Sequence, residues 1–412
     1  SVRIVDWPEG ERLPFGELVE RLGKAGDNDT EMHAILAEFN LPYRFERDVI
    51  NAANRIDDGI TKEEIERRRD MRPRTTFTID PADAKDFDDA LSLHKIEEGL
   101  WEVGVHIADV THYIRPDDVL DCEARDRGTS VYLVDRTVPM LPERLCNKLC
   151  SLRPNEEKLC FSAVFKLNDN AEVLEEGFGR TVIYSDRRFT YAEAQARIET
   201  GVGDFAEEIL TLNRLAKGLR EARISAGALL FDRREAKFTL DEKGRPTGVY
   251  FKESKEANKL IEEFMLLANR TVAEFVGCPP PGKKAKTFVY RVHDNPDPEK
   301  LANMSLIAHR FGYKVKAEGR RQELNSSLNR MLRDLKGKGE ENLLSILALR
   351  SMAKAKYTTE NIGHYGLAFD HYTHFTSPIR RYPDMMVHRL IQRYLDKGRS
   401  ADKMRTEELC RH

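Results

Sequence analysis

The sequence contains one dense cluster of carboxylates, in the stretch 75–91. Five aspartates fall within ten residues there, namely Asp80, Asp83, Asp86, Asp88 and Asp89. Apolar residues flank the cluster on both sides, whereas the neighbours of a solvated acidic tail are mostly polar. The pattern therefore indicates acids that the fold holds in place.

These acids are expected on a loop between two strands. Residues 75–79 are rich in β-formers, Pro81 ends that strand because it cannot donate to a ladder, and another strand begins near Ala90. Carboxylates brought together on such a loop repel one another, and some would be protonated at neutral pH unless a cation lay among them. All-oxygen ligands favour Mg²⁺ or Mn²⁺ over zinc, and Mg²⁺ keeps positions open for water and substrate phosphate. The stretch therefore favours a divalent-metal site.

Other interpretations of the acidic residues stay open at this point. A calcium loop of the EF-hand type needs a glycine at position six and a glutamate at position twelve, and this spacing lacks both. A solvated acidic turn is the simplest alternative, because short motifs also occur by chance. Asp109, just past a strand expected over 100–107, either joins the metal region or caps a turn, since aspartate is common in both settings.

A second group of residues that suits phosphate chemistry lies near the C-terminal end. The segment 376–381 is Thr-Ser-Pro-Ile-Arg-Arg, and a helix is expected after it over 385–395. Hydroxyls and guanidiniums at the start of a helix offer the donors that phosphate oxygens accept. An N-capped helix with two surface arginines is the alternative. Together with the acidic loop the segment favours phosphoryl transfer, which combines metal-binding acids with a cationic clamp.

Composition sets broad limits on the class of protein. The chain has 412 residues, 40% of them hydrophobic, which allows one large domain with a smaller appendage or two to three domains. No run of eighteen apolar residues and no leader occurs, so we expect a cytoplasmic protein without a membrane span. The net charge of −3 means that a nucleic-acid site would need a local channel of arginine and lysine. Six unevenly spread cysteines favour reduced, buried thiols over disulfides or a zinc site.

Hydrophobic periodicity predicts a mixture of strands and helices. A β-hairpin is expected from 90–96 and 100–107, further strands over 129–133, 159–167, 179–184 and 288–293, and a hairpin region from 229–231 with 235–240. Helices are expected over 117–127, 190–226, 257–275, 298–311, 321–334 and 341–355. Residues 44–72 are dense in charge and suit an exposed connector helix. The chain begins without a methionine and ends inside an expected helix, which suggests an excised fragment.

Five separated motifs carry a resemblance to a known family. They are TIDPADAKDFDDA, HIADV, GTSVY, IEEFMLLAN and GHYGLAFDHYTHFTSPIRRYPDMMVHRLI. In this order they closely resemble the catalytic domain of the ribonuclease II / ribonuclease R family of processive 3′-to-5′ exoribonucleases, and the last block is more similar to the ribonuclease R branch. The resemblance extends from about residue 75 to the end of the chain.

The resemblance implies an α+β fold, in which a mostly antiparallel sheet is surrounded by helices. It implies three segments: a remnant of the second cold-shock (OB) domain over 1–45, a helical linker over 46–74, and the RNB catalytic domain over 75–412. We expect the catalytic domain to be truncated at its C-terminal end and the S1 domain to be absent.

The resemblance also implies roles for individual residues. Asp80, Asp86, Asp88 and Asp89 are expected to hold one or two catalytic Mg²⁺ ions, with Mn²⁺ able to substitute. Arg380 matches the arginine that clamps the scissile phosphate, and Asp88 is expected to be the most damaging single loss. Asp83 stays outside the metal set, because the family does not reliably keep that position acidic.

Four further residues match positions that contact RNA. Tyr132 is expected to pack on the terminal nucleotide and Phe231 to stack on the other side of the terminal bases, although aromatics mostly serve cores. Glu263 and Tyr191 resemble residues that contact sugars near the 3′ end, with Glu262 as the alternative to Glu263. A carboxylate beside a ribose 2′-hydroxyl offers a way to prefer RNA over DNA.

The expected activity is hydrolysis of single-stranded RNA from a free 3′ end into 5′-mononucleotides, by a monomer. A catalytically impaired relative that binds RNA is one alternative, and the complete acidic set with Arg380 argues against it. A metal phosphodiesterase acting on small nucleotides is another, and it would need no stacking channel. A structural calcium-binding module leaves Arg380 and the paired aromatics unexplained.

Overall fold

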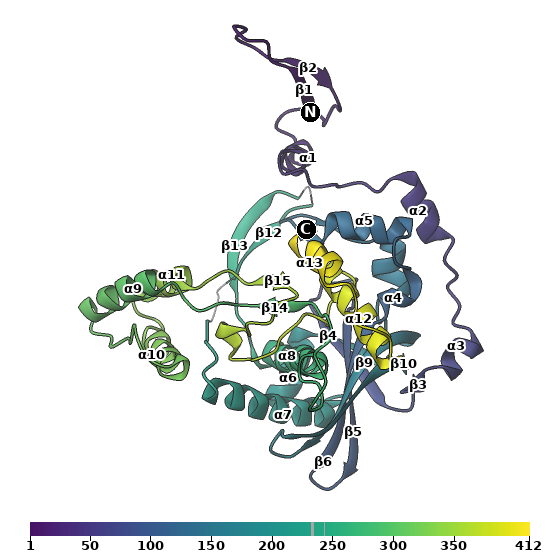
Figure 1. Cartoon of the computed structure of the whole chain (residues 1–412), viewed down its shortest axis with the longest axis vertical. Coiled ribbons are helices and arrows are strands. Elements are labelled where there is room, and N and C mark those ends of the chain that lie inside the picture. The colour runs from purple at the N-terminus through teal and green to yellow at the C-terminus, as the bar shows by residue number, and fades with distance from the viewer. Residues whose placement is uncertain (232–234, 243) are drawn as a thin grey trace.

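The computed structural model describes residues 1–231, 235–242 and 244–412, and its centre is a seven-stranded sheet (Figure 1). The strand order is β11-β4-β5-β6-β9-β10-β3. The four inner pairings are antiparallel, while β11 and β3 join the two edges in parallel, so the expected mostly antiparallel sheet is confirmed. The strands are β3 (Arg69–Asp70), β4 (Thr75–Asp80), β5 (Asp89–Glu97), β6 (Leu100–Ala108), β9 (Glu157–Asn168), β10 (Val173–Tyr184) and β11 (Arg187–Thr190).

The hairpin of β5 and β6 has the turn that the sequence predicts. Gly99 adopts φ +77° there, a left-handed conformation that glycine reaches without a steric penalty. Strands β6 and β9 are buried along most of their length, so they lack the alternation of a strand with one wet face. They form the middle of the sheet, and β4 and β5 carry the acidic loop beside them.

The predicted helices are present, with shifted ends in several cases. The longest, α8 (Glu256–Gly277), ends just before the Pro-rich segment that begins at Pro279. The expected helical region 190–226 forms two helices. The helices are α1 (Asn28–Glu38), α2 (Arg47–Asn54), α3 (Lys62–Glu66), α4 (Val110–Tyr113), α5 (Val119–Arg127), α6 (Tyr191–Thr200), α7 (Ala206–Ser225), α8, α9 (Pro298–Arg310), α10 (Arg321–Asp334), α11 (Glu341–Ser351), α12 (Tyr382–Leu395) and α13 (Lys403–Arg411), with shorter turns η1 (Arg144–Leu149) and η2 (Tyr365–Leu367).

Two hydrophobic cores organise these elements. The larger core joins the sheet to α8 and α12, and Phe161, Phe264 and Phe375 are fully buried in it. The smaller core lies among α9, α10 and α11, which form a lobe at one side of the molecule (Figure 1). Phe231 is partly buried against this smaller core. The lobe and the sheet are therefore packed as separate units of one fold.

The N-terminal part differs from the sheet-centred body in having little buried surface. Strands β1 (Val2–Asp6) and β2 (Phe15–Leu18) form an exposed hairpin that extends away from the sheet (Figure 1). The charged stretch that follows is not the single exposed helix that we expected. It forms the short helices α2 and α3, and Val49 and Ala53 of α2 are buried in the larger core, because the apolar residues of α2 all lie on one face.

The remaining strands form small two-stranded pairs. The expected hairpin region is formed by β12 (Glu235–Leu240) with β13 (Pro246–Lys252), while 229–231 is not a strand. The other pairs are β7 (Val131–Tyr132) with β8 (Thr137–Val138), and β14 (Tyr290–Val292) with β15 (Lys356–Thr358). All six cysteines are free thiols, and three of them are buried. Within the described ranges, no helix combines the length and the apolar character needed to cross a bilayer.

Candidate functional site

The acidic loop begins where β4 ends and closes where β5 begins. Asp80 is the last residue of β4, and Asp89 is the first residue of β5. The two strands pair only as far as Phe77 and Leu91, and the end of β4 pairs with β11 instead. The strands therefore separate before they reach the acids, and the loop 81–88 opens at this end of the sheet.

Asp88 lies inside the protein and contacts the segment that carries the two arginines. Its Oδ1 accepts a hydrogen bond from the backbone N–H of Ile379 at 2.9 Å, and its Oδ2 lies 3.4 Å from Nε of Arg380. Only 6% of Asp88 is exposed, whereas 40% of the Arg380 side chain is exposed. The predicted acid and the predicted phosphate clamp are therefore in contact, and the arginine still reaches solvent.

Burial raises the pKa of all four aspartates in the expected metal set. The pKa rises to about 8 for Asp88 and to about 7 for Asp80 and Asp89, and the pKa of Asp86 is raised as well. Repulsion among these carboxylates adds to burial, while Arg380 opposes it at Asp88. Near neutral pH such a group of acids either retains protons or binds a cation.

The acid set fits a divalent cation by its donor chemistry. All its donors are oxygens, and Oδ2 of Asp80 is buried without a hydrogen-bond partner. A cation would supply that partner and lower the raised pKa values. The carboxylates do not converge on one point in this conformation: among the described residues, no three Asp, Glu, His or Cys side chains are grouped closely enough to hold an ion. Binding therefore requires the side chains of Asp80, Asp86, Asp88 and Asp89 to adjust.

An arginine that the sequence analysis missed, Arg188 of β11, also holds the acidic loop in place. Its Nη2 donates to the carbonyl oxygens of Pro81 and of Ala82, the latter at 3.1 Å. Its guanidinium carbon also lies 5.4 Å from the centre of the Phe87 ring, and its charge opposes the raised pKa of Asp80. Arg188 reaches the loop because β11 pairs in parallel with β4, and local sequence patterns do not predict that pairing.

Three elements hold the segment 374–381 in place. Oδ1 of Asn269, on α8, accepts the backbone N–H of Phe375 at 2.7 Å. The carbonyl of Arg380 accepts the backbone N–H of Ser130 at 3.0 Å, which ties the segment to the strand that bears Tyr132. Asp88 supplies the third attachment through Ile379. The position of the Arg380 guanidinium therefore depends on α8, the GTSVY strand and the acidic loop together.

The two arginines of this segment have different environments. Arg381 is largely buried, and its Nη2 donates to Oδ1 of Asp384 at 2.7 Å. Helix α12 begins at Tyr382 without a side-chain cap. The alternative of an N-capped helix with two surface arginines is therefore wrong, and of the two it is Arg380 that contacts Asp88.

The structure brings two of the predicted RNA-contacting aromatics close to the acidic loop. Tyr132 is 55% exposed, and its pKa rises to about 12 through burial and the charges of Asp86 and Asp88. Burial and the charges of Asp89 and Asp80 also raise the pKa of Tyr191. Both rings therefore lie within electrostatic reach of the expected metal ligands.

The other two predicted RNA contacts have structural partners. Phe231 packs on the smaller core. Glu263 is buried and accepts hydrogen bonds from Nε of Arg223, at 3.2 Å, and from Nη2 of the same residue. These bonds connect α8 to α7. Glu262, the alternative match, has a side chain that is 56% exposed. Of these two glutamates, Glu262 thus has the carboxylate more open to a ligand.

Two acids near the loop lie outside the site. Asp109 is fully buried, and its Oδ2 lies 2.8 Å from Nη1 of Arg68 and 3.3 Å from Nε of Arg180. Asp109 therefore joins a structural ion pair, neither ligating with the other acids nor capping α4 through its side chain. Asp83 is exposed on the acidic loop, and its exclusion from the metal set stays a prediction.

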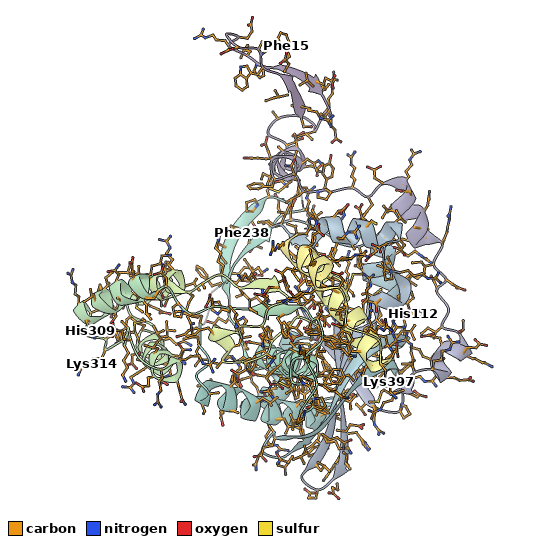
Figure 2. The ribbon with its side chains drawn as sticks, viewed as in Figure 1. Phe15, His112, Phe238, His309, Lys314 and Lys397 are labelled. Atoms are coloured by element: carbon orange, nitrogen blue, oxygen red, sulfur yellow. The ribbon has the colours of Figure 1, made fainter. Side chains whose placement is uncertain are left out.

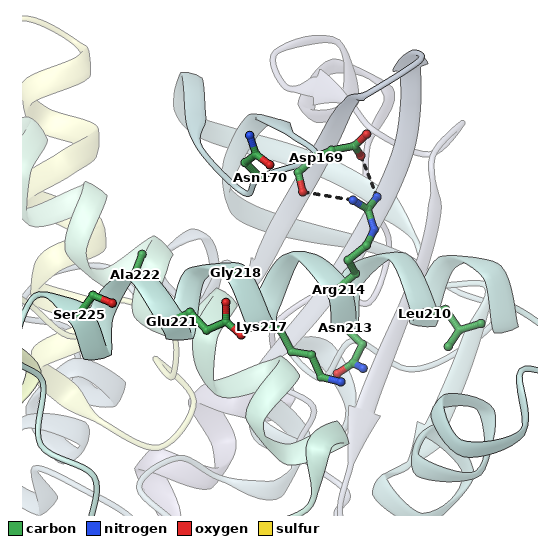
Figure 3. A pocket seen from close by; sticks show the side chains of 10 residues that line it. All are labelled: Asp169, Asn170, Leu210, Asn213, Arg214, Lys217, Gly218, Glu221, Ala222 and Ser225. Atoms are coloured by element: carbon green, nitrogen blue, oxygen red, sulfur yellow. Dashed lines mark hydrogen bonds and ion pairs between the residues drawn. The ribbon is translucent and has the colours of Figure 1, made fainter. Parts of the chain in front are cut away.

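A depression on the described surface lies elsewhere, along α7 (Figure 3). Its volume is about 640 Å³, and its lining includes Asn213, Lys217 and Ser225. Asp169 and Arg214 at its rim form an ion pair at 2.8 Å. Two of its charged residues are thus engaged with each other, and its lining contains none of the predicted site residues.

Two family models match the chain. Residues 68–397 match the model of the RNB domain, and residues 1–46 match the model of the cold shock domain. Ribonuclease R of Aquifex aeolicus is 40% identical over 414 residues, covering 98% of this chain and 57% of that protein. DIS3-like exonuclease 2 of Schizosaccharomyces pombe is also 40% identical, over 422 residues, covering 96% of this chain and 45% of that protein.

A solved structure extends the likeness to three dimensions. Mycoplasma genitalium RNase R in complex with ribose-methylated single-stranded RNA superimposes with a TM-score of 0.90 at 26% identity, covering 99% of this chain and 65% of that chain. The chain spans about half the length of the curated relatives it matches.

Proposed function

Since this chain belongs to the RNB family, we propose that it is the catalytic part of a Mg²⁺-dependent, processive exoribonuclease. The enzyme would hydrolyse single-stranded RNA from its 3′ end and release 5′-mononucleotides. We propose further that residues 1–45 are the remnant of a second cold-shock domain, 46–74 a linker, and 75–412 the catalytic domain. We also propose that the enzyme acts as a monomer and that Mn²⁺ can substitute for Mg²⁺.

The contact between Asp88 and Arg380 is the observation that carries this proposal. It places a desolvated carboxylate 3.4 Å from a guanidinium that remains partly exposed. A phosphate diester that enters here meets a cationic clamp and a group of acids suited to a divalent ion, which are the two requirements of phosphoryl transfer.

The chain's own residues would position the substrate. The guanidinium of Arg380 would bind a phosphate oxygen. Two hydrogen bonds hold the backbone around Arg380 in place: its carbonyl accepts one from Ser130, and Asp88 accepts one from the N–H of Ile379. Tyr132 and Tyr191 would pack against the terminal nucleotide and its sugar, so that any base is accepted. Asp80, Asp86, Asp88 and Asp89 would hold the Mg²⁺, which supplies an activated water and neutralises charge on the phosphate. The water oxygen bonds to phosphorus, the bond from phosphorus to the 3′ oxygen of the preceding nucleotide breaks, and that oxygen takes up a proton.

The test is a time course with RNA labelled at its 5′ end, in the presence of Mg²⁺. We expect the labelled strand to shorten to one small end product without abundant intermediates. Asp88→Asn and an excess of chelator should each abolish shortening, whereas Asp83→Asn, a change to an exposed acid of the same loop, should leave the rate unchanged. Internal cuts, or equal loss in both variants, would contradict the proposal.

One observation favours a second candidate, a relative that binds RNA without cleaving it. Both oxygens of Asp88 are already engaged, by Ile379 and by Arg380, and its pKa is about 8. If that contact persisted in the presence of Mg²⁺, the set would lack one ligand. RNA binding by the wild-type chain, without cleavage at any Mg²⁺ concentration, would support this candidate.

A further inference from the structure

The hairpin of β12 and β13 stands at the rim of the acidic loop. Nζ of Lys252 lies 5.9 Å from the centre of the Tyr191 ring. The hydrogen bond to Glu235 is the main cause of the raised pKa of Lys237, and the charge of Asp83 adds to it, so Lys237 lies near that acid. Figure 1 shows the hairpin arching from the middle of the molecule towards α1. One end of the hairpin is thus beside the predicted site.

The tip of the hairpin reaches the N-terminal part of the chain. A Cβ added at Gly244 would lie 3.3 Å from Nδ2 of Asn28, at the start of α1, and 3.8 Å from Asp135. Asn28 itself donates to Asp135 at 3.3 Å. The hairpin therefore spans the distance between the acidic loop and α1.

The two faces of the hairpin differ in composition. Lys237 pairs directly with Tyr250, and Lys252 is two residues further along the same strand, so these three side chains share one face. Phe238, labelled in Figure 2, pairs with Val249 and shares the opposite face with Phe251. Because Lys237 and Lys252 approach Asp83 and Tyr191, the face with Tyr250 is the one turned towards the site.

We propose that the face formed by Lys237, Tyr250 and Lys252 binds the single-stranded RNA immediately upstream of the nucleotides held at the acidic loop. The inference rests on the proposed function, because it takes the 3′ end of the RNA to lie at the acids. Tyr250 provides an exposed ring on which a base can stack, and the two ammonium groups provide contacts for the backbone.

Stacking is expected to contribute more than charge on this face. Glu235 lies 2.8 Å from Lys237 and neutralises part of its charge. Tyr250 is 55% exposed, so its ring is open to a base. Base stacking on an aromatic tolerates any sequence, which suits a surface that guides a strand without reading it.

The test compares two neighbouring residues of β13 that point to opposite faces. Tyr250→Ser and Phe251→Ser remove aromatic rings of similar exposure, 55% and 61%. Binding of fluorescent RNA is measured by anisotropy with chelator present, so that the result does not depend on cleavage, once with a tetranucleotide and once with a strand several times longer. Thermal unfolding of each variant checks that the hairpin change leaves the fold intact.

We expect Tyr250→Ser to weaken binding of the long RNA by at least about five-fold, the lower limit for one base stacked on an aromatic ring. The tetranucleotide should bind as it does to the wild type, and Phe251→Ser should change neither. Lys237→Gln should reduce the slope of log affinity against log salt by about 0.7 for the long RNA, as expected for one phosphate contact.

Two outcomes would overturn the inference. One is unchanged binding of long RNA by Tyr250→Ser, and the other is equal weakening by Tyr250→Ser and Phe251→Ser, which would show that the RNA does not use this face. Failure of the proposed function gives a different result. The wild type would then not shorten RNA in the time course, while binding of long RNA would still depend on Tyr250.

Discussion

Arg381 and Asp384 form a buried ion pair at 2.7 Å directly behind the arginine that faces the acidic loop. Oδ1 of Asp384 also accepts the backbone N–H of Ser377 at 2.7 Å, so one carboxylate fixes both ends of the turn that presents Arg380. Burial opposes ionisation of this carboxyl, yet the charge of Arg381 holds its pKa below the usual range. The pair therefore sets the position of Arg380 without touching a substrate.

Replacing Asp384 should lower activity through that geometry. In Asp384→Asn the buried Arg381 loses its counter-charge and the turn relaxes, and a shift of about 1 Å at a reacting group costs on the order of 100-fold in rate. We expect kcat to fall about 10- to 100-fold while KM for long RNA changes little, measured at a temperature where the variant is fully folded. A rise in KM with kcat unchanged would contradict a positioning role.

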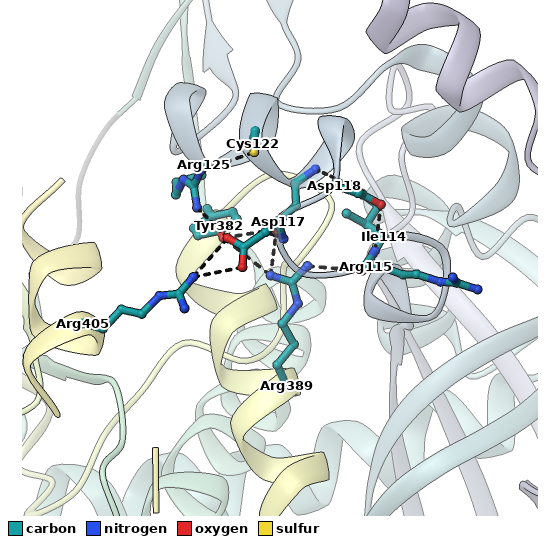
Figure 4. A network of polar contacts seen from close by, with 10 residues as sticks. Ile114, Arg115, Asp117, Asp118, Cys122, Arg125, Tyr382, Arg389 and Arg405 are labelled. Atoms are coloured by element: carbon teal, nitrogen blue, oxygen red, sulfur yellow. Dashed lines mark hydrogen bonds and ion pairs between the residues drawn. The ribbon is translucent and has the colours of Figure 1, made fainter. Parts of the chain in front are cut away.

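Asp117→Asn is the matched control for that variant. Asp117 is an exposed aspartate that pairs with Arg405 of α13 and Arg125 of α5 (Figure 4). Exposed ion pairs contribute little to stability, so both kcat and the unfolding temperature should stay near those of the wild type.

Arg188 should control the affinity of the acidic loop for its cation. Arg188→Met removes the bonds to Pro81 and Ala82, and loss of such a supporting contact typically weakens metal binding about 10-fold or more. Removing a positive charge acts in the opposite direction, so Arg188→Lys, which keeps the charge, separates the two effects. We expect weaker Mg²⁺ binding in both variants, measured by titration calorimetry.

The neighbouring Arg187→Met serves as the control, because Arg187 pairs with Asp204 at 2.9 Å and, within the part of the chain that the structure describes, makes no hydrogen bond to the acidic loop. Its Mg²⁺ affinity should equal that of the wild type. Tighter binding in Arg188→Met would show that charge outweighs loop geometry.

The acidic loop was predictable because its signals are local. β-formers before Asp80, the strand-breaking Pro81 and the hairpin after Ala90 lie within a short stretch of chain, and the structure has all three features. The main helices were predictable for the same reason, since an apolar face at helical spacing identifies them. Which segments the loop would meet was not visible in these patterns.

The missed features depend on pairings between distant parts of the chain. Arg188 reaches the loop because β11 joins β4 in parallel, and the largely buried Arg381 has a counter-charge because Asp384 lies three residues further on, in α12. The charged stretch before the sheet was expected to be exposed, yet its residue Arg68 is buried against Asp109, and β3 beside it adds to the sheet edge. Charge density alone does not distinguish a solvated arginine from one with a buried partner.

Arg68 should therefore contribute to the stability of the catalytic domain. Arg68→Met leaves the buried Asp109 with Arg180 and the hydroxyl of Thr111 as neighbours, and breaking a buried pair costs about 3–5 kcal/mol of unfolding free energy. Urea denaturation measures this loss. The double variant Arg68→Met with Asp109→Leu should recover part of it, because the fully buried carboxylate of Asp109 is then removed together with its partner, while Glu64, which also pairs with Arg68, stays partly exposed.

Arg72→Met is the control for Arg68, since Arg72 pairs with Asp70 and Glu157 near the surface and should change stability little. A loss in Arg68→Met no larger than in Arg72→Met would mean that the linker is not docked on the sheet. It would also favour a catalytic unit that begins at residue 75.

His106 should make the fold less stable in mild acid. It is buried between Ser92 and Ser162, with ring nitrogens 2.8 and 2.7 Å from the two hydroxyls, and burial lowers its pKa to about 3. In the unfolded chain a histidine has a pKa of about 6.5. Between these two pKa values the unfolded state binds a proton that the folded state does not. The unfolding free energy is therefore at its full value above about pH 6.5 and declines as the pH falls below that. From pH 7.5 to 5.5 this one histidine should remove about 1.4 kcal/mol.

His106→Gln keeps a donor and an acceptor for the two serines but cannot titrate. Its unfolding free energy, measured in urea at both pH values, should therefore fall by about 1.4 kcal/mol less than that of the wild type. His94→Gln, at an exposed position of β5, should retain the wild-type difference between the two pH values. Contributions from the aspartates of the acidic loop are common to all three proteins and cancel in this comparison. Identical pH dependence in His106→Gln and the wild type would show that His106 is protonated inside the fold, with the two serines rearranged to accept from it.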